Sequence, residues 1–187
     1  WENKNKYDIF LYGENDHLFL EEHIDKYLEY TSILPNDRIA GLIQYEECPD
    51  GNRFYPGYHA KYDWDKKSIE IHDGKVFAHF TNIHQATFII TNYQLIEIGK
   101  TQDFTKFLKN NPHNNAVQSR GYSVKCQVNT DIYQYCGMKK LICISEFSKN
   151  QIRHLPNLYV DGSKGRHKLG SNSTRMNMAI HELINSI

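Results

Sequence analysis

The sequence predicts a mostly β protein, built of small barrels with flanking α-helices, and three observations support this class. From Arg38 onward, apolar and polar residues alternate with a period of two, as in strands that bury one face. Turn signals separate these runs, among them Asp73-Gly74, a pair that favours a tight hairpin. The runs are short, and one bends at Pro56-Gly57, which is typical of an edge strand or a bulge.

The first element that we expect is a helix over Asn15–Tyr30. Asp16 stands at a capping position, acidic residues crowd the first turns, and apolar residues recur near helical spacing. A short helix with Thr101 as its cap is expected over 101–111. Between these two helices, strands are expected at 38–47, 52–63, 68–75 and 76–83, and the run 87–100 supplies one or two more.

The C-terminal half repeats the alternation of strands and turns. An amphipathic helix is expected over 174–186, with its apolar residues on one face. The other expected elements are strands at 122–128, 131–135 and 139–147, a helical turn at 148–155 and a loop at 160–173. The predicted units are an N-terminal helical extension (1–35), a first barrel (36–98), and a second barrel-like β unit with connecting and C-terminal helices (99–187).

Composition indicates a globular chain with a charged partner. Hydrophobic residues make up 40% of the chain and charged residues 24%, and no apolar run approaches the length of a membrane span, so we expect no membrane contact. Residues 1–99 hold 9 basic and 17 acidic residues, a net charge of −8, whereas residues 100–187 hold 13 and 5, a net charge of +8. This split indicates a basic face for a polyanion or an acidic face for a basic partner, unless the halves neutralise each other within one fold.

The sequence contains none of the common motifs for catalysis or for binding a cofactor or metal. The ten histidines form no zinc-protease motif, the four cysteines lack the paired spacing of a zinc site, and no phosphate-binding glycine motif occurs. Carboxylates crowd the hairpin around Asp63, Glu70 and Asp73, but they lie on a turn and on the polar face of an alternating strand. We therefore expect a solvated face there, no enzyme activity, no catalytic residue, no cofactor and no metal.

The stretch DGNRFYPGYHAKYDWDKKSIEIHDGK (Asp50–Lys75) resembles the Tudor family. An aromatic residue precedes Pro-Gly, an alternating run follows, and an acid-Gly turn ends it, as in the second and third strands of that family. The resemblance covers roughly Arg38 to Ile83, under a third of the chain. The expected layout, with a connecting helix and a C-terminal helix around a second β unit, is similar to the tandem Tudor arrangement of DNA-damage checkpoint adaptors.

This resemblance implies SH3-like barrels, recognition of methylated lysine on a histone tail, contact with DNA, a checkpoint role in the cell cycle and a nuclear location. In such proteins, aromatic faces hold the methylammonium group by cation–π attraction, and an acid supplies charge. Two further aromatic positions of the family hold Ile71 and Lys75 here. The cage candidates are Tyr45, Tyr55 and Asp73 by position, with Trp64 and Phe77 as substitutes.

Basic residues of the C-terminal half are the candidates for DNA contact. Segments such as KGRHK, within a Gly/Ser loop, suit phosphate contacts, and no base-reading motif accompanies them, so we expect salt-sensitive binding of low specificity. The candidates are Arg120, Lys125, Lys139, Lys140, Lys164, Arg166 and Lys168. The alternatives are a β-rich reader like the bromo-adjacent homology domain, a metal-dependent DNA-processing nuclease, and an interaction scaffold that uses the acidic helix.

Overall fold

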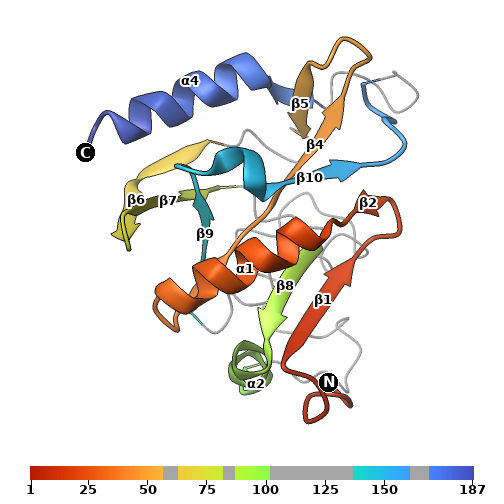
Figure 1. Cartoon of the computed structure of the whole chain (residues 1–187), viewed down its shortest axis with the longest axis vertical. Helices are drawn as coiled ribbons and strands as arrows, with labels where there is room; N and C mark the ends of the chain where they lie inside the picture. Colours follow the sequence, from red (N-terminus) through yellow and green to blue (C-terminus); the bar gives the residue numbers. More distant parts are fainter. Residues whose placement is uncertain (57–62, 82–86, 102–136, 161–168) are drawn as a thin grey trace.

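The computed structural model describes residues 1–56, 63–81, 87–101, 137–160 and 169–187 (Figure 1). The strands are β1 (Ile9–Gly13), β2 (His17–Leu18), β3 (Arg38–Ala40), β4 (Ile43–Glu47), β5 (Arg53–Pro56), β6 (Trp64–His72), β7 (Lys75–Phe80), β8 (Thr87–Thr91), β9 (Lys139–Cys143), β10 (Gln151–His154) and β11 (Leu169–Asn172). The helices are α1 (Glu21–Ile33), α2 (Asn92–Gly99) and α4 (Ser173–Ile184), with a 3₁₀ turn η5 (Phe147–Asn150). Within these ranges, no helix has both the length and the apolar character needed to cross a membrane.

The strands form three sheets. One pairs β1 with β8, a second has the order β11-β5-β4-β10-β2, and a third has the order β3-β9-β7-β6. The prediction of a β-rich fold is confirmed, and none of the three sheets closes into a barrel within the described ranges. Two parallel pairings, of β3 with β9 and of β4 with β10, place strands from 36–98 and from 99–187 in the same sheets.

The N-terminal helix begins later than the sequence pattern predicts. α1 begins at Glu21, because residues 17–18 pair with β10 as the short strand β2. Leu20 takes the N-cap position, and Nδ1 of His23 accepts its N–H at 3.1 Å. Asp16, the expected cap, instead directs its carboxylate toward β10. The prediction of a helix over 15–30 was therefore wrong in its first turn, where pairing between distant segments overrides the local helical signal.

The run 87–100, expected as strand, changes to helix at Thr91. Thr91 Oγ1 accepts the N–H of Gln94 at 3.1 Å, and Gln94 Oε1 accepts the N–H of Thr91 at 2.9 Å. This reciprocal capping box begins α2 directly after β8. Leu95 and Ile98 of the new helix are buried, so its apolar residues face the core at helical spacing.

The C-terminal helix is confirmed as α4, and the Asn172 side chain caps it by accepting the N–H of Arg175 at 3.0 Å. The helical turn expected at 148–155 ends at Asn150, after which β10 pairs in parallel with β4. The predicted helix after Thr101 and the predicted strands at 122–128 and 131–135 lie outside the described residues, as does most of the predicted loop at 160–173.

Buried apolar side chains form three clusters. The largest lies between α4 and the sheets and contains Trp64, Phe147 and Ile180. A second lies beneath α1, where the ring of Tyr30 packs edge-on against Phe77 with the centroids 5.6 Å apart. The third joins α2 to β8 and to the start of β9. The helices thus cover the sheets by packing their apolar faces against them.

Candidate metal centre

The aromatic candidates for a methyl-lysine cage pack in the core. Tyr55 and Trp64 are 2% and 6% exposed and belong to the cluster beneath α4. Phe77 is 0% exposed and belongs to the separate cluster beneath α1. A cage needs open aromatic faces that a cation can approach. The structure therefore does not bring these three rings together on an exposed face.

The remaining cage candidates lie on partly open surface. Tyr45 is half-buried, and the guanidinium of Arg53 lies over its ring at 4.4 Å from the centroid. A cation of the chain itself thus covers one face of this ring. Asp73 is exposed in the turn between β6 and β7, where it adopts a positive φ of 46°. Histone reading by these residues stays a prediction.

Two of the DNA-contact candidates lie in the described part of the chain. Lys139 is half-buried at the start of β9. Lys140 is 3% exposed, and its carbonyl oxygen accepts a hydrogen bond from Nδ1 of His79 at 2.9 Å. The other candidates lie outside the described residues: Arg120, Lys125, Lys164, Arg166 and Lys168.

Ion pairs join the acidic and the basic halves of the sequence. Lys149 of η5 binds the carboxylate of Glu22 on α1, and the guanidinium of Arg153 on β10 lies 3.8 Å from Glu47 on β4. Some of the opposite charge of the two halves is therefore neutralised within the fold.

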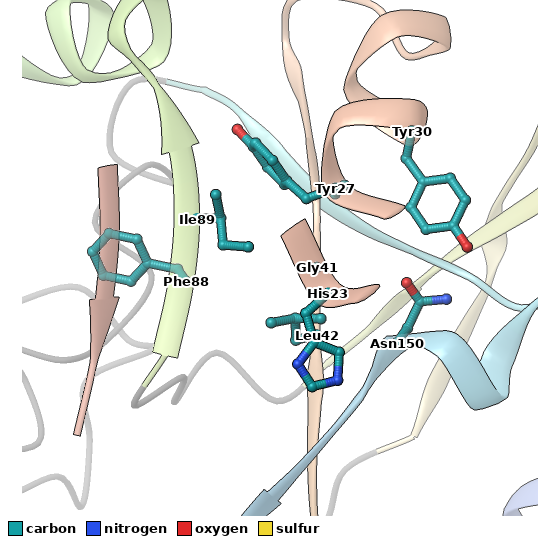
Figure 2. Close-up of a pocket in the computed structure, with 9 residues that line it drawn as sticks. His23, Tyr27, Tyr30, Gly41, Leu42, Phe88, Ile89 and Asn150 are labelled. Atoms are coloured by element: carbon teal, nitrogen blue, oxygen red, sulfur yellow. The ribbon is translucent and has the colours of Figure 1, made fainter. Parts of the chain in front are cut away.

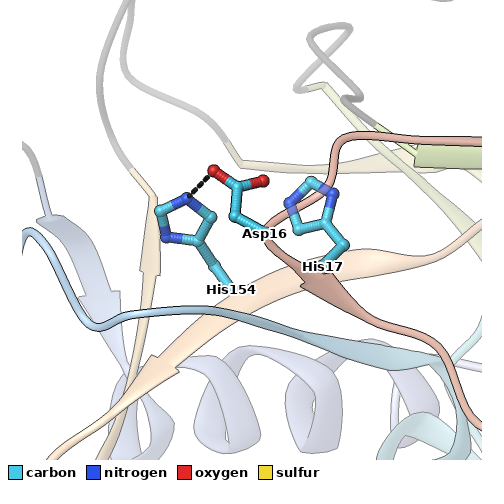
Figure 3. Close-up of side chains that lie close together, drawn as sticks. All are labelled: Asp16, His17 and His154. Carbon is cyan, nitrogen blue, oxygen red and sulfur yellow. Dashed lines mark hydrogen bonds and ion pairs between the residues drawn. The ribbon is translucent and has the colours of Figure 1, made fainter.

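A polar cluster lies where the N-terminal segment meets β10 (Figure 3). Asp16 stands in the connection between β1 and β2, His17 begins β2, and His154 ends β10. The antiparallel register places His17 directly opposite His154, and the two ring centroids are 5.6 Å apart. One nitrogen or carboxylate oxygen from each of the three residues lies within 4.8 Å of the other two.

His154 is held between two carboxylates. Its Nδ1 lies 2.7 Å from Oε1 of Glu46, and its Nε2 lies 3.2 Å from Oδ2 of Asp16. Glu46 is 0% exposed, and its other oxygen, Oε2, accepts the backbone N–H groups of Tyr159 at 2.9 Å and Val160 at 2.7 Å. This buried carboxylate fixes the ring and directs Nε2 toward the cluster.

His17 is held by a hydroxyl group, since its Nδ1 lies 2.5 Å from Oγ1 of Thr87. Burial is the main effect that lowers the pKa of His17 to about 4, and the neighbouring His154 ring lowers it further. The Asp16 carboxylate and a hydrogen bond with Gln44 raise this pKa, but by less. The ring is therefore neutral at pH 7. A neutral imidazole that donates from Nδ1 to the hydroxyl carries its lone pair on Nε2.

Two polar atoms of this cluster are buried without a hydrogen-bond partner of ordinary geometry. They are Oδ1 of Asp16 and Nε2 of His17. The Gln44 side chain raises the pKa of the His17 ring, but it does not meet the geometry of a hydrogen bond with Nε2. One backbone hydrogen bond holds Asp16 beside the end of β10, since its carbonyl oxygen accepts the N–H of Leu155 at 2.6 Å. A buried polar atom left without a partner costs roughly 1–3 kcal/mol, so a water molecule or an ion that binds these two atoms would stabilise the cluster.

The cluster offers two imidazole nitrogens and a carboxylate, a donor set that suits a divalent transition metal. Each ring is also bound at Nδ1 by a group outside the set, His154 by Glu46 and His17 by Thr87. Metal-binding histidines usually carry such a partner, because it fixes the tautomer and the ring orientation. Both rings therefore direct Nε2 into the cluster, where Nε2 of His154 contacts Asp16 and Nε2 of His17 is unpartnered.

A small cavity lies beneath α1 (Figure 2). His23, Tyr27 and Tyr30 of α1 line it, with Phe88 of β8 and Asn150 of η5 among the other lining residues. Its volume is about 10 Å³, whereas one ordered water needs roughly 10–15 Å³. The cavity can hold at most a water molecule, so we do not consider it a site for an organic ligand.

No family model matches the chain, and no curated protein or solved structure is significantly similar to it. Sequence analysis missed the polar cluster because Asp16 and His154 are 138 residues apart. Glu46 follows the alternation of a strand and shows no sign in the sequence of being buried. The adjacent Asp16 and His17 were the only local signal, and their role depends on the pairing of β2 with β10.

Proposed function

We propose that the protein binds a divalent transition-metal ion through Asp16, His17 and His154, and we take zinc as the ion for the tests. The observation that carries this proposal is the pair of buried, unpartnered atoms, Asp16 Oδ1 and His17 Nε2, beside Nε2 of His154. Glu46 and Thr87 act as the outer partners that orient the two imidazole rings.

The charges of the cluster also favour a cation. The two nitrogens of His154 face the carboxylates of Glu46 and Asp16, so without a metal the ring donates to both only if it carries both protons. Two carboxylates therefore lie beside the ring of His154 in a partly buried cluster. A divalent metal takes the place of the proton on Nε2 and balances both carboxylates.

The distances suit a metal after a small contraction. Ligand atoms that lie ~2.0–2.2 Å from a tetrahedral metal are roughly 3.3–3.5 Å apart. Nε2 of His154 and Oδ2 of Asp16 are already 3.2 Å apart, and all the ligand atoms of the set lie within 4.8 Å of one another. Binding therefore requires one side chain to move inward by about 1 Å. The two imidazoles favour zinc, nickel, copper or iron over magnesium and calcium, which prefer sites made of oxygen ligands.

Calorimetric titration of zinc into the chelator-treated chain tests this proposal. We expect one bound ion per chain and no competition from magnesium. His17→Gln removes one ligand and is expected to weaken binding by roughly tenfold or more. The matched control is His181→Gln, because His181 is an exposed residue of α4 outside the cluster. Equal zinc affinity in wild type and His17→Gln, with both folded by circular dichroism, would contradict the proposal.

The opposite charges of the two sequence halves favour a second candidate function, a DNA- or chromatin-binding adaptor without catalytic activity. In this proposal the chain contains Tudor-like units, acts in the nucleus in the DNA-damage response, and contacts DNA and methylated histone tails. The basic Gly/Ser segment with Lys164, Arg166 and Lys168 supplies the phosphate contacts.

Changing Lys164, Arg166 and Lys168 together to Glu tests the adaptor proposal. We expect the triple variant to keep its fold and to lose binding to a short DNA duplex at low salt. Unchanged affinity would contradict DNA contact by this segment. NMR titration with methylated and unmethylated histone-tail peptides tests the second partner, and zinc- or manganese-dependent cleavage of the duplex would favour the nuclease alternative instead.

A further inference from the structure

The three ligand residues lie where two sheets meet. Asp16 lies in the connection that follows β1 of the two-stranded sheet, whereas His17 begins β2 and His154 ends β10, both in the five-stranded sheet. The outer partners come from both sheets, since Thr87 begins β8 and Glu46 lies on β4. Figure 3 shows Asp16 between the two imidazole rings. A metal at this point would therefore hold the β1–β2 connection and the edge strand β2 against β10.

The backbone holds this junction by few contacts. β1 pairs with β8 along five residues, but β2 pairs with β10 along only two. In the described part of the chain, one further backbone hydrogen bond crosses the junction, from the N–H of Leu155 to the carbonyl oxygen of Asp16 at 2.6 Å. Residues 14–18 are thus held against β10 mainly by this short pairing and by the polar cluster.

We infer that metal binding at Asp16, His17 and His154 holds residues 14–18 against β10, and that this segment opens locally when the metal is withdrawn. The inference rests on the proposed metal site. Without the metal, the cluster keeps two buried polar atoms without partners, and opening of the segment exposes both atoms to water. With the metal bound, opening requires the ion to be released.

Linkage sets the size of the effect. A ligand that binds only the closed form lowers the population of the open form by the factor 1 + [L]/Kd, which is ~100-fold when free zinc is about 100 times its Kd. Amide hydrogens that exchange through the local opening should slow by the same factor. The backbone N–H of Leu155 is the most direct reporter, because its acceptor belongs to Asp16.

Native-state hydrogen exchange on the full chain, with zinc sulfate or with a chelator, tests the inference. The comparison amide is that of Ile144, which donates to the carbonyl oxygen of Val76 at 2.8 Å beside the four-stranded sheet. In the chelator-treated protein, we expect Leu155 to exchange faster than Ile144 and to be insensitive to low urea concentrations, as for a local opening. Zinc should slow the exchange of Leu155 by ~100-fold at 100 times Kd.

Two results would overturn the inference while leaving the metal site intact. One is bound zinc, shown by calorimetry on the same sample, with no slowing of the Leu155 amide. The other is a chelator-treated protein in which Leu155 and Ile144 share one urea-sensitive opening, because residues 14–18 then open only with the whole fold. Absence of zinc binding in the calorimeter would refute the proposed function and this inference together.

Discussion

Replacing Glu46 by Gln tests how the outer carboxylate controls the metal site. Oε2 of Glu46 accepts the backbone N–H groups of Tyr159 and Val160, while Oε1 faces Nδ1 of His154. The carbonyl oxygen of Gln can keep the two backbone contacts, which turns its NH₂ group toward Nδ1. His154 must then accept at Nδ1 and carry its proton on Nε2. That proton is donated to Asp16, and it occupies the nitrogen that the metal needs.

The expected cost to stability is moderate and the cost to metal binding is large. One charge-assisted hydrogen bond of roughly 1.5–3 kcal/mol is replaced by a neutral bond of roughly 0.5–1.5 kcal/mol, so the free energy of unfolding without metal should fall by about 1–2 kcal/mol. Loss of an outer carboxylate that orients a metal-binding histidine typically weakens metal binding by about 10–100-fold. We expect zinc affinity to fall within that range.

Glu46→Ala provides the comparison, because it removes the acceptor altogether. Three hydrogen bonds, from the His154 ring and from the N–H groups of Tyr159 and Val160, are then lost. Each lost bond costs roughly 1–3 kcal/mol, so the free energy of unfolding should fall by at least about 3 kcal/mol. This is a large fraction of the ~5–15 kcal/mol that stabilises a typical domain.

Urea denaturation in the presence of a chelator measures both losses of stability, and calorimetry measures the zinc affinity of the folded Gln variant. The reasoning would be refuted if Glu46→Gln bound zinc as tightly as wild type. It would also be refuted if the Gln and Ala variants lost equal stability, because the Gln side chain is expected to keep the backbone contacts.

Two further predictions concern residues outside the cluster. Tyr55→Ala is expected to lower the free energy of unfolding by ~3–5 kcal/mol in urea, because it empties a core position that is 2% exposed; unchanged stability with lost binding to a methylated peptide would argue for a cage role instead. Burial is the main effect that lowers the pKa of His79 below 6.5, and the positive charges of Lys140 and Lys139 lower it further. The hydrogen bond to the Lys140 carbonyl and the charge of Asp65 act in the opposite direction. Since the unfolded chain then binds the proton more readily, stability should fall as the pH drops below about 6.5. Urea midpoints measured across this range should fall less for His79→Asn than for wild type, and equal pH dependence would contradict the prediction.

Local signals in the sequence predicted the parts of the fold that depend on neighbouring residues. The hairpin between β6 and β7 turns at Asp73-Gly74, where both residues adopt the positive φ values, 46° and 71°, that this pair favours. The helix α4 follows from its apolar periodicity and from its Asn172 cap. The β-rich class follows from the alternating runs.

Distant pairing decided the parts that sequence analysis missed. Residues 17–18 continue an amphipathic pattern that favours helix, yet they pair with β10 as the short strand β2. Asp16 was interpreted as a helix cap, whereas the same pairing brings its carboxylate to His154. Glu46 follows the alternation of a strand, and only the parallel pairing of β4 with β10 shows that it is buried. The polar cluster is therefore a product of sheet topology that no local motif encodes.

The central claim is that a metal binds at Asp16, His17 and His154, and anomalous diffraction from a crystal grown with zinc tests it most directly. We expect one anomalous peak at the zinc absorption edge, ~2.0–2.2 Å from Nε2 of both histidines and from an oxygen of Asp16. A peak only at other residues, with these three side chains arranged as they are here, would contradict the account.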